Sequence, residues 1–234
     1  MLTSKQESIE SPISADEMRK IEDWGVSVGI SKLVMMENAG HSIADEAMRV
    51  LTRNIRRTRF ARVALLAGTG NNGGDAFVAA RQISYWLNGG ADLFLIGNEK
   101  EIKAAEALRN WRILKKLRHH VRITNIDSLS KADTLTRKLR PFDLIISGIF
   151  GTGFHGEPRA IQKKAIEALN QNSNAVVISI DIPSGMEADS GGSVIAVESD
   201  LTVTMFAPKI GMFANRKAKK LCGRIAIANI GIPR

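Results

Sequence analysis

The chain has 234 residues, 44% of them hydrophobic, which is enough for one sizeable core and predicts one domain rather than two. Its single cysteine, Cys222, excludes an internal disulfide and, beside four histidines, a thiolate-based zinc site, so a reducing, cytoplasmic location is expected. The first twelve residues are polar, and no run approaches the roughly 20 apolar residues of a membrane span, so neither a secretory signal nor a membrane protein is expected.

The N-terminal part is expected to contain a flexible tail, residues 1–12, followed by two helices. Ser14 and Glu17 have the spacing of a capping box, and the helix that they begin is expected to end near Gly25 and Gly29. A second, longer helix is expected after Ser31. Its apolar residues recur at helical spacing, which predicts that it packs against a sheet.

Beyond these helices, short apolar runs alternate with helix-length segments, which is the pattern of βαβ units. Two of the runs are almost continuously apolar, as expected for strands covered on both faces of a parallel sheet. The seven predicted strands are residues 62–67, 91–97, 121–124, 143–150, 175–182, 201–206 and 224–230. Since no linker or repeat divides the chain, residues 13–234 are expected to form one Rossmann-like, three-layer α/β/α domain with a mostly parallel sheet.

The formal net charge of +9 favours encounters with polyanions. It is concentrated in residues 53–62, 109–122 and 215–220, but two of these runs have helical patterns, in which lysine and arginine most often form a solvated face. Only one tyrosine is present, and the phenylalanine and tryptophan residues are expected in the core rather than in a stacking platform. A nucleic-acid partner is therefore the less favoured interpretation.

Three polar, glycine-rich turns follow predicted strands. They are GTGNNGGD at residues 68–75, GTGFHGE at 151–157 and DIPSG at 181–185. In an open parallel sheet, ligands bind beyond the carboxyl ends of the strands, so the three turns are expected along one rim.

The first turn satisfies the spacing G-x-G-x-x-G between a strand and a helix, a position where backbone amides meet phosphate or other polar groups. No acidic residue ends the next predicted strand to take a ribose hydroxyl, because Glu99 is expected in the first turn of the following helix, which disfavours an ordinary NAD dehydrogenase. A phosphate-transfer loop is disfavoured because Asp75 would repel a triphosphate. The neutral groups of Asn71 and Asn72 suit a ribose, an amide or a monovalent cation.

Five motifs occur in order along the chain: MMENAG at 35–40, GTGNNGGDAFVAAR at 68–81, FGTG at 150–153, IDIPSGMEADSGG at 180–192 and LTVTMFAPKIG at 201–211. Together they resemble the NAD(P)H-hydrate epimerase family, the YjeF N-terminal domain, over essentially the whole chain. The resemblance implies a Rossmann-like fold, often dimeric, that interconverts the R and S epimers of hydrated NADH and NADPH (NADHX and NADPHX). An ADP- or ATP-dependent NAD(P)H-hydrate dehydratase, fused to it in many microbes, then repairs these compounds.

The resemblance also implies roles for individual residues. Asn72 and Ser184 match ligands of one potassium ion per subunit, and Lys209 lies in the family's K-x-G segment. Asp181 matches an acid that contacts the substrate, and it is the obvious carboxylate for the acid–base chemistry that epimerisation requires. The implied substrate-binding positions are Asn71, Asn72, Gly73, Gly74, Asp75, Gly151, Thr152, Gly153, Phe154, His155, Gly156, Glu157 and Asp181.

The chain departs from the family at Ser147, where the pattern has an aspartate that is a potassium ligand close to the chemistry. Asp143 cannot replace it, because four residues at about 3.3 Å each place it roughly 13 Å away. A carboxylate lost at about 4 Å from the ion forfeits on the order of 4 kcal/mol at an effective dielectric constant of 20, so potassium binding is expected to weaken. Asp181, Ser147 and Lys209 are the expected catalytic residues, and Asn72, Ser147 and Ser184 the expected metal ligands. Asp75, Glu157 and His155 are further candidates for the missing function.

Two functions of different class stay open. The first is a working epimerase acting on NADHX or NADPHX, expected as a homodimer formed through its N-terminal helices and linked functionally to a dehydratase. The second is a catalytically impaired nucleotide-binding module, similar to the related domain of certain messenger-RNA decapping enhancers, whose basic helices bind RNA or a protein. The epimerase is favoured because the residues of the substrate loops are otherwise retained.

Overall fold

The computed structural model describes residues 11–54, 58–88 and 90–233. Most of the predicted flexible tail, residues 1–10, lies outside the described residues, as do three residues of the first basic run. Within the described part of the chain, no helix combines the length and the apolar character that crossing a membrane requires.

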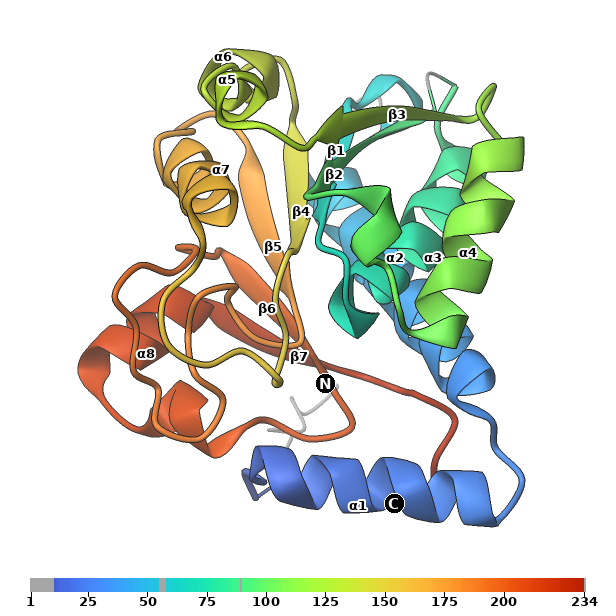
Figure 1. Ribbon diagram of the computed structural model, residues 1–234, viewed down its shortest axis with the longest axis vertical. Coiled ribbons are helices and arrows are strands. Elements are labelled where there is room, and N and C mark those ends of the chain that lie inside the picture. The colour runs from blue at the N-terminus through green and yellow to red at the C-terminus, as the bar shows by residue number, and fades with distance from the viewer. Residues whose placement is uncertain (1–10, 55–57, 89, 234) are drawn as a thin grey trace, which may run out of the picture.

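Seven strands form one sheet in the order β3-β2-β1-β4-β5-β6-β7, and every pairing is parallel (Figure 1). All seven predicted strands are confirmed, and the sheet is parallel throughout rather than mostly so. The strands are β1 (Val63–Ala67), β2 (Ala91–Ile96), β3 (Val121–Ile126), β4 (Leu144–Gly148), β5 (Val176–Ile180), β6 (Leu201–Met205) and β7 (Arg224–Ala228).

Helices cover both faces of the sheet, which confirms the predicted three layers (Figure 1). Successive residues of a strand point to opposite faces: Leu65 packs with the cluster that includes α2, α3 and α4, and Leu66 with the cluster of α5, α6 and α7. The continuous apolar runs therefore supply two cores. The helices are α1 (Ala15–Ser27), α2 (Lys32–Asn54), α3 (Asn71–Trp86), α4 (Ala105–Lys116), α5 (Leu129–Ala132), α6 (Leu135–Leu139), α7 (Ala160–Asn170) and α8 (Arg216–Cys222), with short 3-10 helices η1 (Thr58–Phe60), η2 (Glu99–Glu101) and η3 (Ile210–Phe213).

Helix α1 lies outside both helical layers, at the end of the sheet (Figure 1). Its predicted capping box is present, since Ser14 N donates to Glu17 Oε2 at 2.7 Å and Glu17 N to Ser14 Oγ at 3.1 Å. The chain just before α1 is held by a parallel bridge between Ile13 and Lys209. This bridge places α1 beside the carboxyl ends of the strands.

The expectation that phenylalanine and tryptophan belong to the core is wrong for part of the set. Phe60, Tyr85 and Trp86 are 68%, 81% and 51% exposed, and the rings of Tyr85 and Trp86 contact each other edge to face. Tyr85 and Trp86 are the last two residues of α3, and Phe60 is the last residue of η1. Trp24, at the end of α1, is exposed as well.

The strand order reverses between β1 and β4. From β1 the chain continues to β2 and β3 on one side, and it returns to β4 on the other. The loops that leave β1 and β4 therefore diverge, which opens a crevice at the carboxyl ends of these two strands. The first two of the three glycine-rich turns lie at this point.

Candidate functional site

A cleft of about 780 Å³ opens at the carboxyl ends of the strands and is bordered by α1. The structure brings ten of the predicted substrate-binding positions to it: Asn71, Asn72, Asp75, Gly151, Thr152, Gly153, Phe154, His155, Glu157 and Asp181. Gly73, Gly74 and Gly156 do not line it, and neither do Ser147, Ser184 and Lys209. The three predicted turns thus share one rim, and several of the residues assigned to them lie behind its surface.

The first wall of the cleft is the turn after β1, which depends on close backbone contacts. A Cβ on Gly68 would lie 2.1 Å from the carbonyl oxygen of Ile149, and one on Gly73 would lie 2.0 Å from the carbonyl oxygen of Gly68. Both distances are too short for any side chain, so glycine is required for α3 and the β4 loop to meet the turn. Gly70 caps α3 without a side-chain hydrogen bond, which leaves the first N–H groups of the helix facing the cleft.

Behind this wall lies a buried network of neutral groups. The Nδ2 of Asn72 donates to the carbonyl oxygens of Phe150 at 2.7 Å and Ile180 at 3.2 Å. The hydroxyl of Ser184 accepts from Phe150 N at 3.0 Å and from Ser147 Oγ at 3.3 Å, and it donates to the carbonyl oxygen of Phe150 at 3.1 Å. The network joins the loops after β1, β4 and β5.

Potassium is the cofactor that the resemblance implies, and Asn72, Ser147 and Ser184 are the residues that would hold it. The Ser184 hydroxyl already makes three hydrogen bonds, which is its full capacity, and the amide of Asn72 occupies two carbonyl oxygens that would otherwise face an ion. No carboxylate among the described residues bonds to these three side chains, and no group of three or more His, Cys, Asp or Glu there has a metal-binding arrangement. The side chains that would hold the ion thus bond to each other or to backbone groups, and none of them brings a negative charge to it.

The second wall is built by two tight turns at the ends of β5 and β6. Ile182 N donates to Ile180 O at 2.8 Å around Asp181, whose φ is 66°, and Ala207 N donates to Met205 O at 2.7 Å around a residue with φ of 61°. A hydrogen bond from residue i+2 to i with a positive central φ defines the rare, strained form of γ-turn. Such strain persists only where the surroundings hold it.

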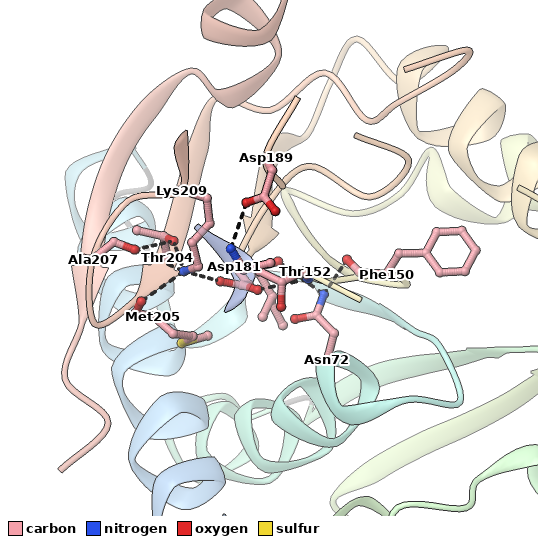
Figure 2. Close-up of polar contacts among 11 residues, drawn as sticks. Asn72, Phe150, Thr152, Asp181, Asp189, Thr204, Met205, Ala207 and Lys209 are labelled. Atoms are coloured by element: carbon pink, nitrogen blue, oxygen red, sulfur yellow. Dashed lines mark hydrogen bonds and ion pairs between the residues drawn. The ribbon is translucent and has the colours of Figure 1, made fainter. Parts of the chain in front are cut away.

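Lys209 holds the two turns together, as Figure 2 shows. Its side chain is 0% exposed, and its ammonium donates to Asp181 Oδ1 at 2.8 Å and to Thr204 Oγ1, Met205 O and Ala207 O at 3.0 Å each. The other carboxylate oxygen of Asp181 accepts from Thr152 N at 3.3 Å. A buried ion pair, satisfied on both sides, thus fixes Asp181 at the base of the cleft.

Carboxyl groups crowd the same end of the cleft. Burial raises the pKa of Asp75 well above its ordinary value, and the negative charges of Asp181 and Glu22 raise it further. Burial also raises the pKa of Glu22, with a second contribution from Asp181. The negative charge of Asp75 therefore develops at higher pH than that of an ordinary aspartate.

Sequence reasoning missed several residues that line the cleft: Arg19 and Glu22 on α1, Lys32 at the start of α2, Glu101 on η2, and Arg159 and Gln162 at the start of α7. Glu99 is the acidic residue nearest the end of β2 in sequence, but its carboxylate accepts hydrogen bonds from Trp111 Nε1 at 2.8 Å and Lys115 Nζ at 3.1 Å. Glu101 lines the cleft instead, two residues further on. The signal that identifies α1 as part of the site is absent from local sequence, because contacts with distant residues, such as the Ile13–Lys209 bridge and the hydrogen bond from Ala15 N to Asp189, bring it there.

Comparison with known proteins agrees with this geometry. The family model described as "YjeF-related protein N-terminus" matches residues 32–211. The chain is 38% identical over 224 residues to the NAD(P)H-hydrate epimerase of Cenarchaeum symbiosum and 34% identical over 222 residues to that of Nitrosopumilus maritimus, in each case over 94% of this chain and 95% of the relative.

A second group of relatives is longer. The chain is 34% identical to the bifunctional NAD(P)H-hydrate repair enzyme Nnr of Methanothermobacter thermautotrophicus, and the match covers 100% of this chain but 42% of that protein. The crystal structure of yeast ynu0 superimposes with a TM-score of 0.72 at 23% identity, over 88% of this chain and 85% of that one, and so shares the fold. The chain therefore belongs to the family of the YjeF-related protein N-terminus, as its five ordered motifs predict.

Proposed function

We propose that the protein is an NAD(P)H-hydrate epimerase, an isomerase that interconverts the R and S epimers of NADHX and NADPHX. One observation carries the proposal: the Asp181 carboxylate, oriented by the buried Lys209, stands at the base of a cleft lined by the residues of both implied substrate loops. The names of relatives that match over nearly their whole length support the same activity.

The chemistry gives Asp181 a specific role. Epimerising a hydroxylated ring carbon next to a ring nitrogen requires transient loss of tetrahedral geometry, which develops positive charge across the carbon and the nitrogen. A carboxylate held beside the ring stabilises that charge, and the Lys209 contacts and the Thr152 amide fix its position before the substrate binds. Asp181 is the catalytic residue of the proposal. Lys209 is a positioning residue, because it acts through Asp181.

Ser147 has no contact with the substrate in this proposal. It is 0% exposed and donates to Ser184 behind the cleft wall, so it positions the loop after β4 rather than reacting. The potassium ion of the resemblance stays a prediction for this chain. No step of the proposed reaction passes through the ion.

The remaining assignments accompany the epimerase. We propose a homodimer, a functional link to an ADP- or ATP-dependent NAD(P)H-hydrate dehydratase, and a cytoplasmic location. The link is supported by relatives named as bifunctional repair enzymes, of which this chain spans 42% in two cases. Cys222 suits a reducing compartment, since it is buried and burial raises the pKa of its thiol to about 12.

The direct test is the rate at which the purified R epimer of NADHX is converted to the S epimer, read by an S-specific dehydratase. We expect acceleration over the spontaneous rate, and a loss of about 10²–10³-fold in kcat/KM for Asp181→Asn. Asp189→Asn is the matched control: it makes the same change eight residues away, outside the cleft, where an amide oxygen can still accept from Ala15 N. A wild-type protein without acceleration would refute the proposal.

The alternative, an RNA- or protein-binding module without catalysis, has one observation in its favour. Phe60, Tyr85 and Trp86 expose aromatic surface near Arg59, whose carbonyl accepts from Asn88 N, and such rings can stack on bases. Absence of epimerisation together with salt-sensitive RNA binding in a gel shift would favour this alternative.

A further inference from the structure

Three carboxyl groups meet at one end of the cleft, but a single buried cation pairs with them. Asp181 is bonded to Lys209, whereas the side chains of Glu22 and Asp75 have no ion-pair partner among the described residues. Two cations of the rim next to α1 are engaged elsewhere, since Arg19 pairs with Asp16 and Lys32 with Asp23. Ionising all three carboxyl groups would leave two uncompensated negative charges in a partly buried space.

Asp75 is the member of this group that the fold fixes most firmly. It lies on the second turn of α3, directly after the glycine turn, and is partly buried between the helix and the cleft. The structure shows no hydrogen bond from its carboxyl group to any described residue. It lines the cleft together with Asp181, and both of its oxygens are free for a ligand.

We propose that Asp75 is the general acid of this site, which protonates the departing hydroxyl group of the substrate while Asp181 stabilises the resulting cation. This inference rests on the proposed epimerase function and adds a second catalytic residue to it. Two carboxyl groups in different environments then perform two different roles, which is a recurrent way of running acid and base chemistry at one pH.

The protonation states agree with this assignment. Burial is the largest cause of the raised pKa of Asp75, followed by the charges of Asp181 and Glu22. The charged and titratable groups around it are Glu22 and Arg19 on α1, Lys32 on α2, Glu106 on α4, and Asp181 with Lys209. Asp75 therefore keeps its proton to higher pH than an ordinary aspartate.

The proposed reaction has two steps, loss of water and its return. The proton of Asp75 passes to the hydroxyl oxygen, the C–O bond breaks, and water leaves with the bonding electrons. The lone pair of the ring nitrogen forms a C=N⁺ bond beside Asp181. Water then adds to the opposite face of the ring carbon, and the C=N electrons return to nitrogen. One proton passes from the added water through Asp181 to the Asp75 carboxylate, which restores the general acid.

The kinetic test compares the wild type, Asp75→Asn and Glu22→Gln on the R epimer of NADHX across pH. We expect Asp75→Asn to lower kcat by about 10²–10⁴-fold with little change in KM, because the amide keeps the shape but carries no acidic proton. In the wild type, kcat should fall at alkaline pH as Asp75 ionises. In Glu22→Gln that fall should move to lower pH, since a charge that raises the pKa of Asp75 has been removed.

A second readout is independent of activity. Since the folded-state pKa of Asp75 lies above its ordinary value of 3.8, the side chain destabilises the fold progressively as pH rises from about that value to the folded pKa, and by a constant amount beyond it. Asp75→Asn removes this penalty. Its Tm should exceed that of the wild type by a margin that grows with pH and then levels off.

The outcomes separate the two proposals. An inactive wild type refutes the epimerase, whereas the dependence of Tm on pH still reports whether Asp75 holds a proton. An active wild type with an equally active Asp75→Asn variant overturns the role of Asp75. So does a Tm difference that is the same at every pH.

Discussion

The two walls of the cleft are built by opposite means. The wall after β1 is made of backbone: Gly68 and Gly73 let a turn, a helix and a neighbouring loop approach to distances that no side chain permits. The wall after β5 and β6 is made of side chains, since the buried Lys209 joins two strained turns and aims Asp181 at the cleft. The first wall offers N–H groups to a ligand, and the second offers charge.

The two walls differ in how well the local sequence predicts them. Close approach of two backbone segments requires glycine, so the local sequence predicts where it occurs. A charge in a pocket depends on which groups surround it, and those groups come from α1, α3 and the ends of two strands. Substitutions at the two walls should therefore affect the protein differently. Three substitutions are considered, from the largest expected effect to the smallest.

Lys209→Met should have the largest effect on stability. It leaves the Asp181 carboxylate buried without its partner and removes the ammonium that four acceptors share, so the free energy of unfolding should fall by about 3–5 kcal/mol. Urea denaturation measures it. Lys217→Met is the matched control, because Lys217 is exposed and bonds only to the Ser193 carbonyl among the described residues, and its change should stay within about 0.5 kcal/mol. Equal effects of the two changes would contradict the account of this wall.

Gly73→Ala should break the other wall. The new Cβ would meet the Gly68 carbonyl oxygen at 2.0 Å, and relieving that overlap should cost about 1–3 kcal/mol and weaken binding of NADHX. Gly70→Ala is the control, three residues away in the same turn, since a Cβ there has no atom within 4 Å. Thermal unfolding of both variants gives the comparison. A Gly73→Ala protein as stable as Gly70→Ala would show that the contact is not needed.

Ser147→Asp sharpens the comparison by placing charge behind the backbone wall. The wild-type Tm should be the same in potassium and in sodium at equal ionic strength, because the neutral network needs no ion. The variant buries a carboxylate there, and potassium at about ten times its Kd should stabilise it by about 1.4 kcal/mol. A potassium-specific rise of the Tm in the wild type would instead support the cofactor that the resemblance implies.

Much of the fold could be predicted because its signals are local. The capping box of Ser14 and Glu17 lies within one turn, and the apolar runs that become strands are continuous because both faces of the sheet are covered. The predicted turns also reached one rim, since parallel strands bring their carboxyl ends to the same edge.

The ionisation and the depth of the site residues could not be predicted in this way. The residues near Lys209 in sequence do not indicate that its side chain is wholly buried between the turns after β5 and β6, because its burial depends on where Asp181 lies. The state of Asp75 likewise depends on Glu22, which only the docking of α1 brings near. The exposure of Trp86 was not predicted either, since amphipathic spacing does not say where a helix extends beyond its sheet.

The bridge between Ile13 and Lys209 couples the position of α1 to that of the Asp181–Lys209 ion pair. Ile13 N donates to Pro208 O at 2.9 Å, and Ile210 N donates to Ile13 O at 3.0 Å. The segment leading into α1 is therefore hydrogen-bonded to the backbone on both sides of Lys209. Undocking α1 would therefore withdraw Glu22 and loosen the support of Asp181 in one event. The position of α1 and the position of the Asp181 carboxylate are therefore not independent of each other.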